Sequence, residues 1–509
     1  MSLNPLSYTN RLLRSFSVVG FWTLISRIFG FLRDVMLASF LGSGPLAEAF
    51  IVAFSIPNMF RRLFAEGAFN TAFVPMFSKK ISNLKKAENF ASQAFSLLLT
   101  TLIFLVALAE IFMPLLVYAM ASGFAMDERF VMSVELGRVM FPYILFISLA
   151  AFFGGVLNTF GKYSIAAAAP IILNLFLIVA LLLANFFQLN FGLAISLAVP
   201  LAGITQLIVL WRASSLLEVK IKIRFPIINE EIRLLAKIAL PAALAGGVIQ
   251  INLLVGRQIS SFFDGAVAWL SYADRLYQLP LGMVGIAIGV VLLPNLSKEV
   301  LTSSQKKVLN TVNRSIEFSL FLILPATAAL LIIPTQLISV LFERGAFSEF
   351  DTIYTSNALM VYALGLPAFV LQKIISTIFF ARGDTKTPFR LAILSMLANI
   401  IVALAMIYPT GYLAAAIGTT FSGWLMTLLL WRRAKKLGIT TDFRLRKNCV
   451  KICFSTLIMA IMVLTSAFIL AEQFESHYSR FLALFFTIFL GLTTYLITSK
   501  VLGLFNSET

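Results

Sequence analysis

Charged residues inside a long apolar stretch near the N-terminus are the first candidates for chemistry. In the sequence Ser26-Arg-Ile-Phe-Gly-Phe-Leu-Arg-Asp34, Arg27 and Asp34 are seven residues apart and share one helical face, and Arg33 is adjacent to that face. A guanidinium group stays ionised at any accessible pH and donates two parallel hydrogen bonds to a phosphate. Two arginines and one carboxylate within about two turns therefore predict a place where an anion binds.

The next apolar segment carries a second polar stripe. Glu48 and Glu66 are eighteen residues apart, about five whole turns, so the stripe is roughly 27 Å long. Arg62 lies within it and forms an i, i+4 pair with Glu66, whereas Arg61 has no obvious carboxylate nearby in the sequence. Excess positive charge is therefore predicted on this segment as well.

A third group of polar residues lies near the middle of the chain. Asp274 and Arg275 share a helical face with Ser271, Gln278, Gly282, Gly285 and Gly289. A charge at the bilayer centre costs about 2.5–3.5 kcal/mol, so such residues normally face a bundle interior or a wet cavity. The competing interpretation of each arginine is an interhelical ion pair or a side chain that extends to the interface. Because arginines outnumber nearby acids, we favour a cationic cavity for the set.

The elements that must position these residues are membrane helices. Of 509 residues, 60% are hydrophobic and 12% are charged, with a mean hydropathy of +0.93, whereas soluble domains are about 45–50% apolar and about 25% charged. One helical span takes roughly 20 apolar residues. The sequence predicts an all-α polytopic membrane protein with about fourteen transmembrane helices, at residues 16–40, 45–78, 90–119, 131–159, 164–185, 190–213, 234–262, 266–297, 311–341, 353–380, 386–408, 411–436, 448–471 and 479–504.

Basic residues alternate between the connections and predict the orientation. The net charge is +17, but it is concentrated in every second connection, such as 79–86, 212–237, 298–314 and 432–451. The positive-inside rule makes these connections cytoplasmic. The others, at residues 42–45, 127–129, 185–190, 264–265, 343–351, 409–411 and 472–480, are poor in lysine and are predicted to face outward. Both termini are then cytoplasmic, and the basic balance does not indicate nucleic acid.

The sequence contains an internal repeat. FVPMFSK at 73–79 recurs as LLPNLSK at 292–298, an offset of 219, and two further matches keep an offset of 219 or 220. Each repeat holds six predicted helices, so the two copies enter the membrane with the same orientation. The predicted domains are an N-lobe at 1–213, a cytoplasmic linker at 214–233, a C-lobe at 234–436, and two additional helices within 437–509.

Catalytic and cofactor motifs are missing from the sequence. The segment Gly155–Tyr163 is close to a P-loop, but its glycines are one residue too far apart and Tyr163 replaces the Ser or Thr. His477 is the only histidine, and Cys449 and Cys453 have no second pair. We therefore expect no enzyme activity, metal site or cofactor, and expect the membrane potential or an ion gradient to supply energy.

Four segments carry a resemblance to a known family. The segments Ser26–Asp34, PNMFRRLFAEGAF at 57–69, FVP at 73–75 and YADR at 272–275 resemble the MurJ (MviN) family of lipid II flippases, within the superfamily of multidrug (MATE-like) and polysaccharide (MOP) exporters. The resemblance runs from about Ser15 through the twelfth predicted helix. It implies fourteen helices in two lobes that form a V, in the bacterial inner membrane, and export of lipid-linked cell-wall precursor for peptidoglycan synthesis.

The resemblance also implies roles for individual residues. The family's essential arginines correspond to Arg27, Arg33, Arg61, Arg62 and Arg275, which would bind substrate, and its acidic positions to Asp34, Glu48 and Glu66. Glu48 stands where a family member has the shorter Asp, a difference in reach and not in charge. The last two helices would hold the lipid tail in an apolar groove. The implied partners are undecaprenyl-diphosphate-linked disaccharide pentapeptide (lipid II), membrane lipids, and cell-wall synthesis or division proteins.

The functional hypothesis is alternating access. A cationic central cavity binds the diphosphate from the inner leaflet and releases it outward, and the acids Asp34, Glu48, Glu66 and Asp274 act as gating or ion-pair partners. Two alternatives stay open within transport: export of another polyprenyl-diphosphate glycan, or ion-coupled antiport of a cationic drug through an acid-rich cavity. A membrane enzyme acting on a lipid-linked substrate is the alternative from a different class.

Overall fold

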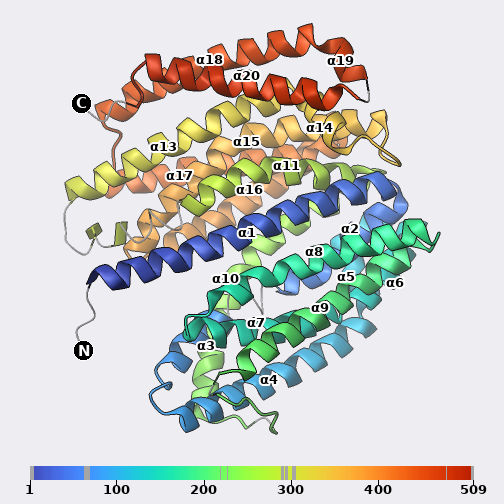
Figure 1. Ribbon diagram of the computed structural model, residues 1–509, viewed down its shortest axis with the longest axis vertical. Helices are drawn as coiled ribbons and strands as arrows, with labels where there is room; N and C mark the ends of the chain where they lie inside the picture. The colour runs from blue at the N-terminus through green and yellow to red at the C-terminus, as the bar shows by residue number, and fades with distance from the viewer. Residues whose placement is uncertain are drawn as a thin grey trace. The chain divides into compact units, whose positions relative to one another are not determined.

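The computed structural model describes residues 5–61, 69–217, 219–225, 227–287, 292, 296–297, 299–300, 305–476 and 478–505 (Figure 1). All regular secondary structure within these ranges is helical. The chain divides into two compact units, Met1–Val267 and Ala268–Thr509. This confirms the predicted all-α class.

Unit 1 contains ten α-helices and one short 3₁₀ helix among its described residues. Their bounds are α1 Pro5–Leu41, α2 Pro45–Arg61, α3 Phe69–Ser78, α4 Leu84–Ile111, α5 Met113–Met120, η2 Ser122–Phe124, α6 Glu128–Met140, α7 Tyr143–Thr159, α8 Tyr163–Phe186, α9 Phe191–Ser215 and α10 Glu230–Ser260.

Unit 2 begins just after the start of α11 and continues to the C-terminus. Its helices are α11 Ala266–Ala287, α13 Gln305–Ile332, α14 Pro334–Phe342, α15 Glu349–Ala381, α16 Lys386–Thr410, η4 Gly411–Leu413, α17 Ala414–Lys436, α18 Phe443–Ile469, α19 Ala471–Glu475 and α20 Arg480–Val501.

Several predicted helices are interrupted. The predicted spans 90–119, 131–159 and 311–341 break at Phe112, at Phe141–Pro142 and at Ile333. Proline lies at or just after each break and cannot donate a backbone hydrogen bond, so the helix ends and restarts there. The predicted span 45–78 consists of α2 and α3, and residues 62–68 between them lie outside the described residues.

Nine helices in the described part of the chain are long and apolar enough to cross a membrane. They include α4, α8, α9, α13, α15, α18 and α20, and two cases in which consecutive helices count together, α6 with α7 and α16 with α17. The chain is therefore a multi-pass membrane protein. The number fourteen stays a prediction.

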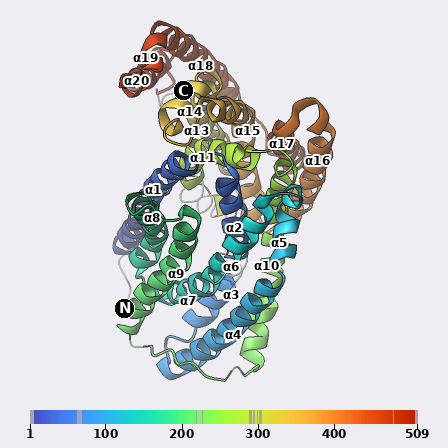
Figure 2. The same cartoon turned by 90° about the vertical axis from the view of Figure 1, so that its right-hand side faces the viewer.

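Aromatic rings fill the core between α3, α4 and α7 of unit 1. The ring of Phe73 stacks on Phe77 at 5.2 Å and on Phe90 at 5.7 Å, and lies 4.7 Å from Phe152. All four rings are almost fully buried. On the other side of the unit α1 packs along α8, which packs along α9 (Figure 2), so the charged segment of α1 is held against a rigid apolar pair.

The segment after α9 extends along α4 before α10 begins. The backbone N–H groups of Lys220, Lys222 and Arg224 donate to Glu88 Oε1, Ser92 Oγ and Ser96 Oγ, at 2.8, 3.0 and 2.8 Å. Every second residue of an extended chain thereby meets every fourth residue of a helix, since both repeats advance by about 6–7 Å.

Further contacts join α10 to the rest of unit 1. Lys80 pairs with Glu231 at 2.5 Å, and α10 contacts α3, α4 and α5. The compact units divide after Val267, and the linker at 214–233 with a C-lobe from residue 234 stays a prediction. The seventh predicted span therefore belongs to unit 1.

Unit 2 packs its helices in two groups. In one, α17 packs against both α15 and α16, and in the other α18 and α20 lie side by side (Figure 1). The phenol of Tyr495 on α20 donates to the Phe321 carbonyl of α13 at 2.6 Å. Gly418 lets α16 and α17 approach closely, because a Cβ there would lie 2.4 Å from Asn399 Oδ1 and 2.9 Å from the Asn399 carbonyl oxygen.

Gly418→Ala is expected to lower the thermal stability of the purified protein, by about 1–3 kcal/mol, because the added methyl overpacks this contact. The matched control is Gly256→Ala on α10, where nothing lies within 4 Å of the added Cβ. That change is expected to be neutral or to stabilise by up to about 1 kcal/mol. Equal unfolding temperatures for the two variants would contradict the close approach.

Candidate functional site

Arg33 is buried and bound within unit 1. Its Nε and Nη2 donate to Asp34 Oδ1 at 3.0 and 2.6 Å, and its Nη1 donates to Asn174 Oδ1 of α8 at 2.9 Å. Arg33 and Asp34 are 7% and 6% exposed. The amide of Asn174 in turn donates to the Ser26 carbonyl at 3.1 Å. One amide side chain therefore fixes both the cation and the backbone of α1.

Arg27 lies on the same helix but in a different environment. Its side chain is exposed, and it makes no hydrogen bond or ion pair within the described residues. The sequence grouped Arg27, Arg33 and Asp34 together, and the continuous helix α1 does bring them within two turns. Asp34 pairs with Arg33, however, so the Arg27 charge is left without a counterion on this face.

The second predicted stripe is only partly described. Arg61 ends α2, is half-buried, and its Nε donates to Asn58 Oδ1 at 3.2 Å. Arg62 and Glu66 lie outside the described residues. The predicted i, i+4 pair between them therefore stays a prediction.

Glu48 lies in a buried ion cluster that the sequence did not indicate. Arg129 Nη1 donates to Glu48 Oε2 at 2.8 Å, and Arg129 Nη2 lies 2.5 Å from Asp127 Oδ2 and 2.9 Å from Asp264 Oδ1. Glu48 Oε1 also accepts from the Val267 backbone N–H at 2.9 Å. Glu48 is 1% exposed, whereas the Asp264 side chain is 95% exposed. One guanidinium thus joins three carboxylates from three segments of the chain.

Arg129 belongs to a connection that was expected to be an outward loop. Phe124 covers its guanidinium at 4.4 Å from the ring centroid, and the hydrogen bonds from Arg129 hold the pKa of Asp127 below its ordinary value. The cluster gathers residues 127–129 and 264, from two connections predicted to share one side, beside Glu48 near the start of α2. In the sequence, only the Asp-x-Arg pattern at residues 127–129 indicates this cluster. The other two partners of Arg129, Glu48 and Asp264, are 81 or more residues away from it.

The third group lies in unit 2, on α11. Gln278 donates to Asp274, which confirms that these two residues share a face, and Arg275 is exposed. Asp274 and Arg275 have further interactions. Tyr277 stacks on Tyr362 of α15 at 5.0 Å. This packing orients α11 against α15.

Lys373 is a further cation that the prediction omitted. It lies within the apolar helix α15, and its Nζ is 3.0 Å from where a Cβ on Gly285 would be. Gly285 belongs to the predicted polar face of α11, so an ammonium group from a neighbouring helix adds to that face. Lys373 is the only lysine between Arg344 and Arg382, which was the available signal.

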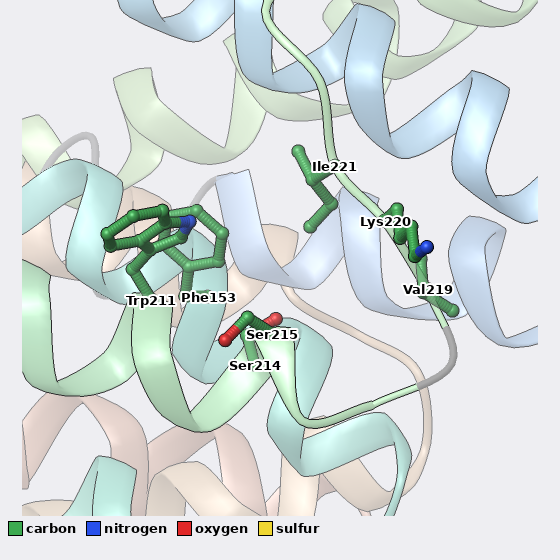
Figure 3. Close-up of a pocket in the computed structure, with 7 residues that line it drawn as sticks. All are labelled: Phe153, Trp211, Ser214, Ser215, Val219, Lys220 and Ile221. Atoms are coloured by element: carbon green, nitrogen blue, oxygen red, sulfur yellow. The ribbon is translucent and has the colours of Figure 1, made fainter.

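A pocket of about 280 Å³ lies elsewhere in unit 1 (Figure 3). Trp211 and Phe153 form one side and Lys220 lies across from them, with Ser214 and Ser215 between. None of the predicted site residues lines it, and it holds a single cation. We therefore do not assign the anion site to this pocket. No group of three or more metal-ligating side chains was found within the described residues.

Arg129→Met is expected to destabilise the protein by about 3–5 kcal/mol, because it leaves the Glu48 carboxylate buried without its cation. Adding Glu48→Gln should recover much of that loss, since the buried charge is then gone. Thermal unfolding of the purified protein in detergent measures both effects. Arg138→Met is the control, an exposed arginine of the same helix α6; an Arg129→Met loss no larger than that of the control would contradict the cluster.

Comparison with known proteins places the chain. A family profile described as "Lipid II flippase MurJ" matches residues 37–489. The chain is 41% identical over 456 residues to the "Probable lipid II flippase MurJ" of Rhizobium tropici, covering 88% of this chain and 86% of that protein. It is 36% identical over 512 residues to the protein of the same description from Rickettsia prowazekii (strain Madrid E), covering 98% and 99%.

Solved structures agree with this placement. A structure described as "Lipid II flippase MurJ, inward closed conformation" superposes with a TM-score of 0.81 at 27% identity, covering 96% of this chain and 98% of that one. An inward-facing multidrug resistance MATE family transporter of the MOP superfamily gives a TM-score of 0.67 at 16% identity, covering 83% and 98%, and shows the fold alone. The extent and the identity of these matches show that the chain belongs to the MurJ family of lipid II flippases.

Proposed function

We propose that this protein moves lipid II from the cytoplasmic to the periplasmic leaflet of the bacterial inner membrane by alternating access, with exposed arginines binding the diphosphate. The observation that carries the mechanism is Arg27, an exposed arginine on α1 that makes no hydrogen bond or ion pair within the described residues. A diphosphate is an anion that matches the bidentate donors of a guanidinium. Arg275 on α11 of unit 2 is a second exposed arginine.

Arg33 takes part in a different way. Its guanidinium is already satisfied by Asp34 and Asn174, so a phosphate must displace one of them to bind. We propose that Asp34 is the competing partner, which holds Arg33 while substrate is absent. Because Asp34 is the next residue on the same helix, this exchange needs side-chain rotation and no movement of α1.

The remaining predicted residues are assigned in the same scheme. Arg61 at the end of α2 and Arg62 add positive charge for binding the diphosphate, and Glu66 neutralises part of it. Asp274 partners the cations of α11, and Lys373 strengthens the positive charge on that face. We propose that Glu48 acts as a gating residue on the side predicted to face outward, through its ion pair with Arg129.

The architecture that we propose has fourteen membrane helices. Two six-helix repeats and two C-terminal helices give both termini on the cytoplasmic side. The C-terminal pair is α18 and α20, and large apolar side chains such as Phe454, Leu457, Phe485 and Phe489 are exposed on it. This exposed surface supports a role in holding the polyprenyl tail.

The membrane potential is the energy source that we propose. When one negative elementary charge leaves a cell with a negative interior, its electrical free energy falls by about 2.3 kcal/mol per 100 mV. A diphosphate headgroup therefore moves outward down the electrical gradient. This proposal needs no cofactor.

Rival functions differ in the charge that they require. A cationic drug would need acids facing it, whereas Arg27 on α1 and Arg275 on α11 are exposed cations. Another polyprenyl-diphosphate glycan would use the same cations. An enzyme acting on lipid-linked substrate would need a group of catalytic acids, and purified protein would then form product.

The wild-type protein should restore growth to cells depleted of their own lipid II flippase. The Arg27→Ala variant is expected to fail to do so. Loss of one charge-assisted contact should weaken diphosphate binding by roughly 10- to 100-fold. The measurement is the exposure of lipid II on the outer face at matched protein levels. Arg212→Ala, an exposed arginine at the end of α9, is the control and should retain function.

Reversing the charge at Arg275 distinguishes transport of an anion from antiport of a cationic drug. Arg275→Glu should be inactive if the substrate is an anion, because repulsion replaces attraction. Retained activity of Arg275→Glu would instead favour drug antiport. Well-expressed wild type that fails to rescue would indicate another lipid-linked glycan as the cargo.

The purified protein in liposomes should move labelled lipid II faster when a potassium diffusion potential makes its cytoplasmic side negative. The potential is set with valinomycin, and the readout is the fraction of label accessible from outside. A transport rate that does not depend on the membrane potential but increases with a sodium or proton gradient would overturn the electrical mechanism. Protein-free liposomes give the background rate.

A further inference from the structure

Arg480 is a buried arginine at the start of α20 that the transport mechanism does not use. It is 4% exposed. Its Nη2 donates to the Glu343 carbonyl oxygen at 2.8 Å, and its Nη1 is 3.7 Å from Glu343 Oε1, too far for a hydrogen bond. Its Nε is buried and donates to no residue in the described ranges. The guanidinium is therefore buried with most of its donors unused.

Arg344 is a second arginine in the same place, on the connection between α14 and α15. Its Nη2 donates to the carbonyl oxygens of Val340 and Leu341 at the end of α14, at 2.7 and 2.9 Å. Its guanidinium lies 5.4 Å from the ring centroid of Phe481. Its Nε is buried and, within the described residues, also has no acceptor.

The charges at this place do not balance. Glu343 is the carboxylate in contact, and its Oε2 is already taken by the Thr352 hydroxyl at 2.7 Å. Burial, and then the like charge of Arg480, lower the pKa of Arg344 below its ordinary value. One loosely held carboxylate thus lies beside Arg480, and no ion pair of Arg344 is found within the described residues. Burying like charges is costly unless an anion completes the site.

A purely structural role explains only part of this arrangement. The bonds from Arg480 to the Glu343 carbonyl and from Arg344 to α14 tie the connection to both helices. Neutral donors such as glutamine would make the same bonds without like-charge repulsion. The unused Nε groups are the donors that a bidentate oxyanion requires.

We propose that Arg344 and Arg480 form a binding site for a phosphate group, supplied by the headgroup of an anionic lipid in the outer leaflet. The half-buried Arg344 is the point of entry. Residues 343–351 and 472–480 are the connections predicted to face outward, and the exposed side chains of Phe481, Leu482 and Phe485 continue from the site along α20. A lipid phosphate bound there would place its acyl chains on this apolar surface. Arg344 and Arg480 are separate from the proposed diphosphate-binding residues, whereas Phe485 also belongs to the surface proposed for the polyprenyl tail.

The test uses the purified full-length protein in phosphatidylcholine nanodiscs with increasing phosphatidylglycerol. Unfolding temperature reports binding, since a ligand of the folded state stabilises it. In a separate arm inorganic phosphate replaces chloride at constant ionic strength. The variants are Arg344→Gln and Arg480→Lys; the lysine keeps the positive charge but lacks the bidentate donors of a guanidinium. The control is Arg433→Gln, at an exposed arginine of α17.

Wild type and the control should be stabilised by phosphatidylglycerol, and both site variants should need roughly tenfold more for the same effect. Stabilisation by inorganic phosphate that is lost in the variants would keep the oxyanion site but overturn the lipid as its source. No stabilisation of wild type by either probe, or equal stabilisation of Arg344→Gln and Arg433→Gln, would overturn the site.

Discussion

A charged side chain among apolar helices must be paired or must face water, because leaving it in hydrocarbon costs about 2.5–3.5 kcal/mol on insertion scales. In unit 1 this constraint decides how helices meet. Asn174 of α8 accepts from Arg33 and donates to the Ser26 carbonyl, and Trp22 Nε1 of α1 donates to Ser164 Oγ of α8 at 2.8 Å, so polar side chains specify the contact between α1 and α8. An aliphatic residue at 174 would leave the guanidinium and the carbonyl without these partners. Packing of apolar faces alone would allow α1 to slide or rotate.

The two buried ion pairs of unit 1 differ in what must happen for them to open. Arg33 and Asp34 are consecutive residues of α1, so the pair opens by rotation of side chains. Arg129 and Glu48 belong to α6 and α2, and Val267 donates to the same carboxylate. That pair opens only if whole segments separate. The first arrangement suits exchange with a substrate, and the second suits a contact that is made or broken by a change of conformation.

The sequence predicted the elements well and the pairings poorly. The segment 164–185 corresponds to α8 at 163–186, because apolar length and flanking polar residues are local signals. The partner of Arg33 is 141 residues away and that of Glu48 is 81 residues away, and no local pattern encodes which helices become neighbours. Arg129 was predicted to be a loop residue because the apolar span was predicted to begin at residue 131, whereas α6 begins at Glu128. The attachment of α10 to unit 1 depends on Lys80, Ser92 and Ser96, which read as ordinary polar residues.

Fold and cargo are separate properties in this architecture. The chain superposes on MATE family transporters with TM-scores of 0.57 to 0.67 at 14–18% identity, which shows that very different sequences adopt this fold. What a scaffold of this kind binds must then follow from the sign and position of the few charges that lack partners. A paired arginine such as Arg129 presents little net charge to a ligand, because its carboxylates neutralise it. Arg27 presents a whole positive charge, so an exposed arginine says more about the cargo than the total of +17 does.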